Sequence, residues 1–394
     1  MKALKYLLLL IVSISYLNCS QQKNPTNNFT LKGTIAGKHG PVIWLKYPDT
    51  NGKIIQQKAV INNGTFIFKG TLSSPVNAEF SDQFYPNITY IRNFYSTTFL
   101  SPGDMTVVLG DNTLDVRKLT GSVMQDDWSK LDRKKKQLYK LQDSISNEIF
   151  KIQRNGNTPK NHAIVETLSQ KIHVIVNKKK QIEYDFIQLN PNSYLSPYIT
   201  QYYFSGMREL QLDSAEKFYD SFATYVKNSV AGKSLKREIT KRKSSAVGSV
   251  APLFIRHDIN NNVIDLKSFR NKNYVLLNFW ASFNEPNPYL KKVYDKYHLN
   301  DLTIIGLSFD ASKNDWKDAI KKYGYEKWIN ILLDIDTLKD SYDIESTPPS
   351  FIFLIDKQGK IIGRYFHGAT YDTNGDNEGT MSNLEQKLKE TFGY

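Results

Sequence analysis

The chain has 394 residues, of which 40% are hydrophobic, and 52 Lys and Arg outnumber 39 Asp and Glu to give a net charge of +13. This length and apolar content exclude both a single ordinary core and a disordered chain, and they predict two or three globular domains. The positive surplus comes without a recognised nucleic-acid-binding motif, so we expect no nucleic-acid partner and at most an affinity for anionic lipid or polymer.

The N-terminus has the organisation of a secretion signal. Two lysines precede an apolar stretch over residues 6–17 that is too short to cross a bilayer comfortably. Cys19 follows, in a context that resembles the lipobox of bacterial lipoproteins, where the thiol is acylated and the signal is removed. The sequence therefore predicts a signal peptide over 1–18, a lipidated polar tether over 19–28 and a lipid-anchored protein of the cell envelope. It would be exposed to the periplasm at the inner or outer membrane. The alternative is a plain signal peptide with an incidental cysteine.

Cys19 is the only cysteine in the chain. No intramolecular disulfide is possible, and no thiol is available for redox chemistry in the segments expected to fold. A single cysteine directly after a signal is better explained as a lipid attachment point. Two or three acyl chains hold a protein at a membrane far more firmly than one, because each buried methylene contributes about 0.8 kcal/mol.

Residues 29–122 are predicted to form a small antiparallel β-sandwich. Short segments with alternating polar and apolar residues recur there, and turns rich in Gly, Asn and Pro separate them. The expected strands cover 29–35, 42–45, 65–70, 97–100 and 105–109.

Residues 123–243 change to charged helix formers and predict a helical region. Asp126 and Asp127 stand where acids favour the start of a helix, and apolar residues follow at helical spacing. The lysine runs 134–136 and 178–180 are expected on solvated faces, and residues 233–243 are expected to form a basic linker. A break is predicted at 190–193.

Residues 248–394 alternate strand and helix, which predicts an α/β domain with a mainly parallel sheet covered on both faces. The expected strands are 274–280, 302–308, 351–355 and 361–365, and the expected helices are 288–297 and 314–323.

Four motifs of this domain resemble the thioredoxin-like family that includes TlpA/ResA-type envelope disulfide reductases and peroxiredoxin-related (AhpC/TSA) antioxidant proteins. They are Gly248-Ser249-Val250-Ala251-Pro252-Leu253-Phe254, the segment 265–272, Leu277-Asn278-Phe279-Trp280-Ala281-Ser282, and Leu354-Ile355-Asp356-Lys357-Gln358-Gly359-Lys360. The resemblance implies a thioredoxin fold over 248–394. More loosely, residues 29–122 and the helices after them resemble a β-domain of unknown function (DUF4369-like) that precedes such domains in lipoproteins of Bacteroidetes-type bacteria.

The family's two redox cysteines are missing after the tryptophan strand. In active members the first thiol stands at a helix N-terminus, which lowers its pKa and permits thiolate attack. A gapless match places Asn284 and Asn287 at the two cysteine positions, whereas a deletion of about one helical turn would also fit and is slightly favoured. The degenerate region comprises Trp280, Phe283, Asn284, Glu285, Pro286 and Asn287.

The second family signature, the cis-proline loop, corresponds to Thr347, Pro348 and Pro349. Either proline fits the cis position, and Pro349 fits slightly better. A rigid turn inherited with the fold and a retained peptide-binding loop are both compatible with this motif.

The sequence thus favours a cell-envelope lipoprotein whose thioredoxin-like domain binds a protein, peptide or glycan without catalysis. The enzyme alternative is the family activity, a thiol-disulfide oxidoreductase or peroxidase, and a third possibility is a structural accessory of an active paralogue. The six histidines show no metal-ligand spacing, and the acidic loop 371–378 lacks the spacing of a calcium site. No catalytic residue, metal or cofactor is predicted.

Overall fold

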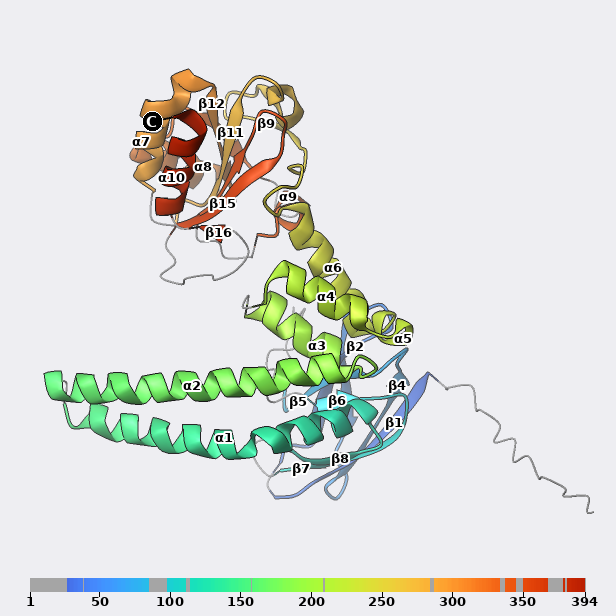
Figure 1. Cartoon of the computed structure of the whole chain (residues 1–394). Coiled ribbons are helices and arrows are strands. Elements are labelled where there is room, and N and C mark those ends of the chain that lie inside the picture. The colour runs from blue at the N-terminus through green and yellow to red at the C-terminus, as the bar shows by residue number, and fades with distance from the viewer. Residues whose placement is uncertain are drawn as a thin grey trace, which may run out of the picture.

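The computed structural model describes residues 27–37, 39–84, 98–110, 114–156, 158–207, 210–283, 287–333, 337–344, 350–367, 378–379 and 381–393. Figure 1 shows a β-rich part, a set of helices that includes a long protruding hairpin, and an α/β domain. Among these residues, no helix is both long and apolar enough to span a bilayer. Cys19, Asn284, Glu285, Pro286, Thr347, Pro348, Pro349 and the loop 371–377 lie outside them.

The β-rich part is a sandwich of two four-stranded sheets, as expected. One sheet has the order β4 (Thr65–Thr71), β1 (Asn28–Ile35), β7 (Gly103–Leu109) and β8 (Val116–Thr120). The other has the order β3 (Ile54–Val60), β2 (Val42–Pro48), β5 (Val76–Ser81) and β6 (Thr98–Leu100). The expectation of purely antiparallel pairing was wrong for β1 and β7, which pair in parallel. The sequence analysis also missed β3, β5 and β8.

The helical region begins with a hairpin of two long helices, α1 (Val123–Arg154) and α2 (Pro159–Leu189). Ser122 and Thr158 cap them, since each side-chain oxygen accepts a hydrogen bond from the backbone N–H three residues later. The region continues as α3 (Leu195–Gln201), the π-helix η1 (Tyr202–Gly206), α4 (Leu212–Ser221), α5 (Thr224–Lys227) and α6 (Val230–Ser244).

Two expectations about basic segments were wrong. Residues 233–243 are not a linker but most of helix α6, because Leu235 and Ile239, one helical turn apart, are both buried. In the run 134–136, Lys135 is fully buried, and its ammonium group bonds the buried carboxylate of Glu183. Its neighbours Lys134 and Lys136 are exposed, as expected.

The α/β domain has a six-stranded mixed sheet rather than a mainly parallel one. Its order is β13 (Ile329–Leu332), β12 (Leu302–Ser308), β11 (Tyr274–Trp280), β14 (Ser350–Ile355), β15 (Ile361–His367) and β16 (Glu378–Gly379). Strand β14 runs antiparallel to both of its neighbours, β11 and β15.

Both faces of this sheet are covered. One face packs against α7 (Tyr289–Tyr297), α8 (Lys313–Tyr323) and α10 (Met381–Phe392). The other packs against residues of the segment 251–269 and of α9 (Thr337–Ser341). That segment contains the hairpin β9 (Ile255–His257) and β10 (Val263–Asp265) and the 3-10 turn η2 (Leu266–Phe269), and a second 3-10 turn, η3 (His298–Asn300), follows α7.

A buried ionic cluster joins the helical region to the α/β domain. The carboxylate of Asp343, just after α9, lies 3.4 Å from Nε of Arg242 on α6 and 3.7 Å from a terminal nitrogen of Arg364 on β15. Arg242 also donates to the backbone oxygen of Phe204 in η1, and its guanidinium lies 4.0 Å from the Phe204 ring centroid. Lys241 on α6 pairs with Asp340 on α9 at 3.1 Å.

Candidate functional site

The candidate site lies at the end of β11, where Trp280 closes the strand. Its indole is 4% exposed and packs edge-on against Tyr325, with ring centroids 5.4 Å apart. The facing backbone is Gly306 of β12. A Cβ atom there would stand 3.2 Å from Nε1 of Trp280 and 2.9 Å from Oδ1 of Asn330, so a larger residue would push the indole aside.

Asn330 is held by the chain around it. Its side-chain amide donates to the backbone oxygens of Tyr325 and Trp328, at 2.7 and 2.9 Å. This fixes the amide orientation and directs its oxygen toward the Gly306 backbone beside Trp280. The tryptophan is therefore a wall of the site that is positioned from β12 and β13, rather than an exposed contact residue.

The turn after Trp280 is tied to the neighbouring strand by the carboxylate of Asp310. That carboxylate accepts from the backbone N–H of Ser282 at 3.0 Å, from its hydroxyl at 2.6 Å and from the hydroxyl of Ser308 at 2.7 Å. Asp310 is only 7% exposed, so these donors replace water around a buried charge. Tyr323 adds a hydrogen bond from its hydroxyl to the backbone oxygen of Ser282.

Phe283 follows this anchored turn and is 70% exposed. It stands next to Ser282 in sequence, so its backbone is held while its ring faces solvent. A large aromatic side chain on a restrained turn loses little conformational freedom when a partner covers it.

Asn287 is buried and lies two residues before Tyr289, the first residue of helix α7. Its Oδ1 accepts from the backbone N–H of Tyr289 at 3.1 Å, which satisfies one of the unpaired donors at the helix start. Its own N–H donates to the hydroxyl of Tyr325 at 3.0 Å. At this position the chain thus has an amide that supports the first turn of α7 from just outside the helix.

The phenols around the site stay protonated at neutral pH. Burial, together with the smaller effect of the nearby Glu385 carboxylate, raises the pKa of Tyr289 to about 12. Burial likewise raises the pKa of Tyr325 above its usual 10.0. Neither phenol therefore serves as a base near pH 7, and the arrangement offers hydrogen-bonding groups and an aromatic ring for contact.

The sequence analysis identified Trp280, Phe283 and Asn287 here but missed Asp310, Ser308, Tyr325 and Asn330. The signal for Asp310 was present, because it follows the predicted strand 302–308 and parallel strands end at the same sheet edge. Where Asn284, Glu285, Pro286, Thr347, Pro348 and Pro349 lie relative to Trp280 stays a prediction, because they fall outside the described residues.

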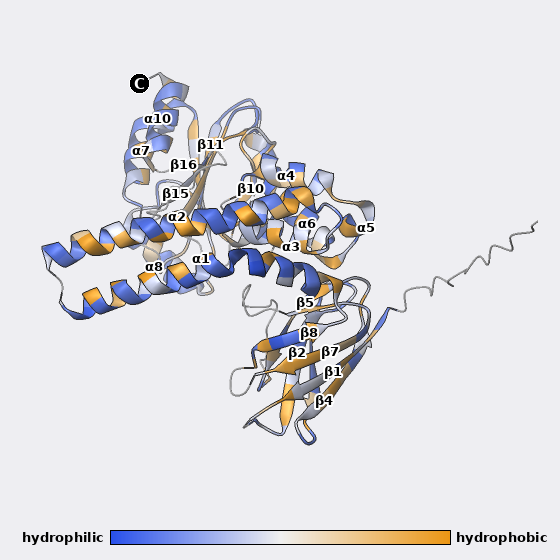
Figure 2. Ribbon diagram, turned by 60° about the horizontal axis from the view of Figure 1, so that its bottom comes forward, coloured by the Kyte–Doolittle hydropathy of each residue, from blue (hydrophilic) through white to orange (hydrophobic). Residues whose placement is uncertain are grey.

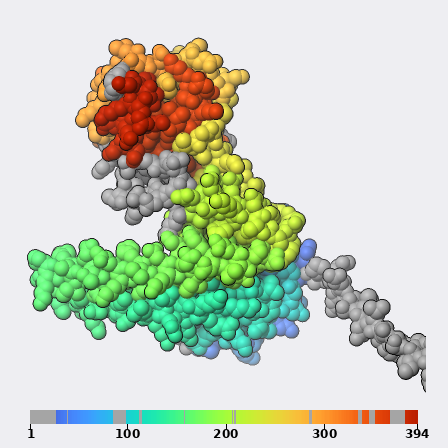
Figure 3. All heavy atoms as spheres, in the orientation of Figure 1, coloured from blue at the N-terminus to red at the C-terminus, as the bar shows by residue number. Residues whose placement is uncertain are grey.

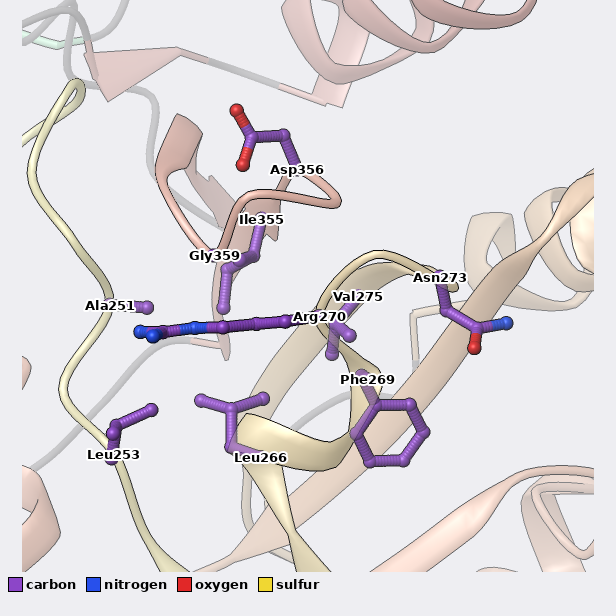
Figure 4. A pocket seen from close by; sticks show the side chains of 10 residues that line it. All are labelled: Ala251, Leu253, Leu266, Phe269, Arg270, Asn273, Val275, Ile355, Asp356 and Gly359. Carbon is purple, nitrogen blue, oxygen red and sulfur yellow. The ribbon is translucent and has the colours of Figure 1, made fainter.

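A separate cavity lies at the opposite end of β11 and has a volume of about 10 Å³. Figure 4 shows the side chain of Arg270 crossing it, between Gly359 on one side and Leu266 on the other. This volume suits about one water molecule. The cavity is therefore too small for a substrate or cofactor. Within the described part of the chain, no three His, Cys, Asp or Glu side chains gather in a way that would hold a metal ion.

Two family models match the chain. The model described as a domain of unknown function (DUF4369) matches residues 29–128, and the model described as thioredoxin-like matches residues 271–361. These matches confirm both resemblances seen in the sequence and the fold class of the C-terminal domain.

Curated relatives match the same C-terminal domain. Thiol-disulfide oxidoreductase ResA of Bacillus thuringiensis is 34% identical over 127 residues, which are 31% of this chain and 71% of the relative. Its namesake in Bacillus subtilis is 31% identical over 126 residues, or 31% of this chain and 68% of the relative.

Two solved structures are also similar to the chain. The thioredoxin domain of a Bacteroides vulgatus thiol-disulfide oxidoreductase is 31% identical, with 36% of this chain and 97% of that chain covered and a TM-score of 0.30. A thiol:disulfide interchange protein from Bacteroides sp. is 31% identical, with 38% and 93% covered and a TM-score of 0.31.

Replacing Asp310 with Ala should loosen the turn that carries Phe283. Two hydroxyls and one N–H would lose a buried charged acceptor, which we expect to lower the free energy of unfolding by about 2–4 kcal/mol. Urea denaturation measures this loss of stability, and the backbone amide hydrogen of Ser282 should exchange with solvent faster in the variant. The free energy of unfolding of Asp310→Asn, which keeps one acceptor oxygen, should lie between those of the parent protein and Asp310→Ala. A Ser282 amide equally protected in Asp310→Ala would contradict this role of the carboxylate.

Proposed function

Because the chain belongs, through its C-terminal domain, to the family of ResA-type thiol-disulfide oxidoreductases, we propose that it uses the family fold as a binding module without catalysing thiol-disulfide exchange. The observation that carries this proposal is the cysteine count. The chain has one cysteine, Cys19, about 260 residues before β11 ends. Thiol-disulfide exchange needs an attacking thiolate and a second sulfur to resolve the mixed disulfide. Asparagine, which a gapless match places at both positions, supplies neither.

The binding surface that we propose centres on Phe283. Exposed aromatic side chains on restrained backbone are typical anchors of protein interfaces. Asp310 and Asn287 restrain the chain near Phe283 through hydrogen bonds to the backbone N–H groups of Ser282 and Tyr289. The partner that suits this surface is a protein or peptide segment with an apolar side chain to cover the ring. The segment 345–349, with its two prolines, is proposed to belong to the same surface on the strength of the family resemblance.

We further propose that Cys19 carries lipid and holds the protein at the cell envelope, facing the periplasm. The support is the apolar stretch over residues 6–17, followed by the chain's single cysteine.

Replacing Cys19 with Ala should release the protein from membranes, because the acyl chains would have no attachment point. Fractionation of cells that express each version measures this. Retention of the Ala variant in the membrane pellet after a carbonate wash would contradict lipidation at Cys19.

The whole chain with Cys19→Ser should show no insulin reduction with dithiothreitol and no peroxide consumption above the blank. Adding Asn284→Cys and Asn287→Cys tests the register of the missing motif. If the cysteines were substituted, the pair stands just before α7 and should form a disulfide, at the cost of about 1 kcal/mol for the lost hydrogen bond between the Tyr289 N–H and Asn287. Absence of the disulfide would indicate that a helical turn was deleted. Clear turnover by the Cys19→Ser chain alone would overturn the proposal and favour the family's enzyme activity.

Phe283→Ala should weaken partner capture at the envelope while leaving the fold intact. Exposed substitutions away from special backbone features change stability by less than about 0.5 kcal/mol. The measurement is crosslinking in the native envelope with partner identification, and circular dichroism checks the fold. Leu299→Ala is the matched control, because Leu299 is also exposed but follows the other end of α7. Equal capture by the parent and both variants would refute the Phe283 surface.

A further inference from the structure

Two segments of the α1–α2 hairpin are strongly basic. Residues 130–142 of α1 contain six basic and one acidic residue, and residues 171–183 of α2 contain four basic and one acidic residue. The two segments, which we call the basic belt, together have a net charge of +8 over 26 residues. In sequence they are far apart, so this concentration becomes evident only when the chain folds.

Two side-chain contacts place these segments beside each other. Lys135 on α1 bonds Glu183 on α2, and Lys179 on α2 donates to Gln142 on α1 at 2.6 Å. Crowding of like charge is visible at Lys179, where burial and then the charge of Lys135 lower the pKa of its ammonium group. Among the other belt cations, Lys130 pairs with Asp127 at 3.3 Å, whereas Arg133, Lys134, Lys136, Lys140, Lys171 and Lys178 are exposed.

One side of the belt combines lysines with exposed aliphatic side chains. The seam of the hairpin is the line along which its two helices pack, and it includes Leu131 and Leu138 of α1. Lys134 lies three positions after Leu131, and Leu141 lies three positions after Leu138. Lys134 and Leu141 therefore lie on one line along α1. On α2, Lys171 and Lys178 follow the seam residues Leu168 and Ile175 by the same spacing.

Equivalent positions of antiparallel helices lie on the same side of their seam, so these two lines face the same way. Val174 lies between Lys171 and Lys178, one turn from each. Leu141 is 51% exposed and Val174 is 54% exposed. Lys134, Lys171 and Lys178 pair with no acidic group among the residues that the structure describes.

The hairpin is also free to meet a large flat partner. It stands out from the remaining helices and from the sandwich in two views (Figures 1 and 2), and its space-filling surface projects well beyond the body (Figure 3). In Figure 2, hydrophilic and hydrophobic residues alternate along the ribbons of both helices. Its outer half has a small core of its own, centred on Ile145, Leu168 and Ile175.

We propose that the α1–α2 hairpin binds the surface of an anionic phospholipid membrane through the basic belt. Clusters of four to eight basic residues on a helix favour anionic lipid, and aliphatic side chains among them reach the region just below the headgroups. Leu141 and Val174, each about half exposed, supply the aliphatic contacts among these lysines. The proposal is independent of the Phe283 surface and of lipid at Cys19.

The test is co-sedimentation of the whole chain with Cys19→Ser, so that no acyl chain contributes. The probes are phosphatidylcholine vesicles with and without about one third phosphatidylglycerol. We expect at least tenfold tighter binding to the anionic vesicles, and weaker binding as the ionic strength rises, because salt screens the lysines. The variant with Lys134→Ser, Lys171→Ser and Lys178→Ser should lose at least tenfold in affinity, since each basic residue contributes about fivefold.

The matched control replaces Lys313, Lys317 and Lys321, three exposed lysines of α8, by Ser. This control variant changes the net charge by the same amount as the belt variant, and it should bind the anionic vesicles almost as tightly as the parent protein. The pair Leu141→Ser and Val174→Ser should also weaken vesicle binding, and circular dichroism should show that the fold of each variant is intact.

Three outcomes would overturn the proposal. The first is equal binding to both vesicle types, and the second is equal loss in the α8 control. The third combines two observations: Leu141→Ser with Val174→Ser leaves vesicle binding unchanged, and polyglutamate binds the protein as tightly as the vesicles do. That result would indicate that the basic belt binds an acidic macromolecule instead.

Discussion

The carboxylate of Asp343 sets how the helical region and the thioredoxin-like domain meet. It is almost inaccessible to solvent and stands between Arg242 of the helical region and Arg364 of the sheet. Removing charges from water costs several kcal/mol per ion, which only close oppositely charged partners and further hydrogen bonds offset. The guanidinium group of Arg242 also donates a hydrogen bond to the backbone oxygen of Phe204, and that of Arg364 donates one to the backbone oxygen of Asp343 at 3.0 Å. Few arrangements of the two parts satisfy all three charges together, so the cluster selects one orientation.

The backbone at Asp343 fits this role. Its φ is +50°, in the left-handed region, where a non-glycine residue normally sits only when the surroundings require it. Here the turn that ends α9 requires it, since Asp343 N–H bonds Asp340 and Ile344 N–H bonds Lys339. The turn points the carboxylate at α6 and β15. Ionic attraction and local turn geometry thus act at the same residue, just before the segment 345–349.

The sequence predicted what depends on neighbouring residues and missed what depends on distant ones. Strands β11 and β12 were predicted correctly because they are continuous apolar runs, whereas β3 was missed because Gln56, Gln57 and Lys58 interrupt its pattern. Helix α6 was taken for a linker because its charges hide the spacing of Leu235 and Ile239. In the site, Trp280 and Asn287 follow from a linear motif. The role of Asp310 does not follow from a linear motif, because it depends on the register of β12 beside β11.

The described geometry near the site is held by groups other than thiols. Asp310 holds the turn before Phe283, Asn287 accepts a hydrogen bond from the first backbone N–H of the helix after it, and Gly306 leaves room for the indole of Trp280. The packing at this end of β11 therefore needs no thiol. In the basic belt, Lys135 lies at the seam beside Trp128 and bonds the buried carboxylate of Glu183. The belt lysines outside the seam stay charged toward solvent, since mutual repulsion there is screened by water and costs the fold little. The hairpin can thus hold a concentrated positive charge without losing its packing, as contact with an anionic surface requires.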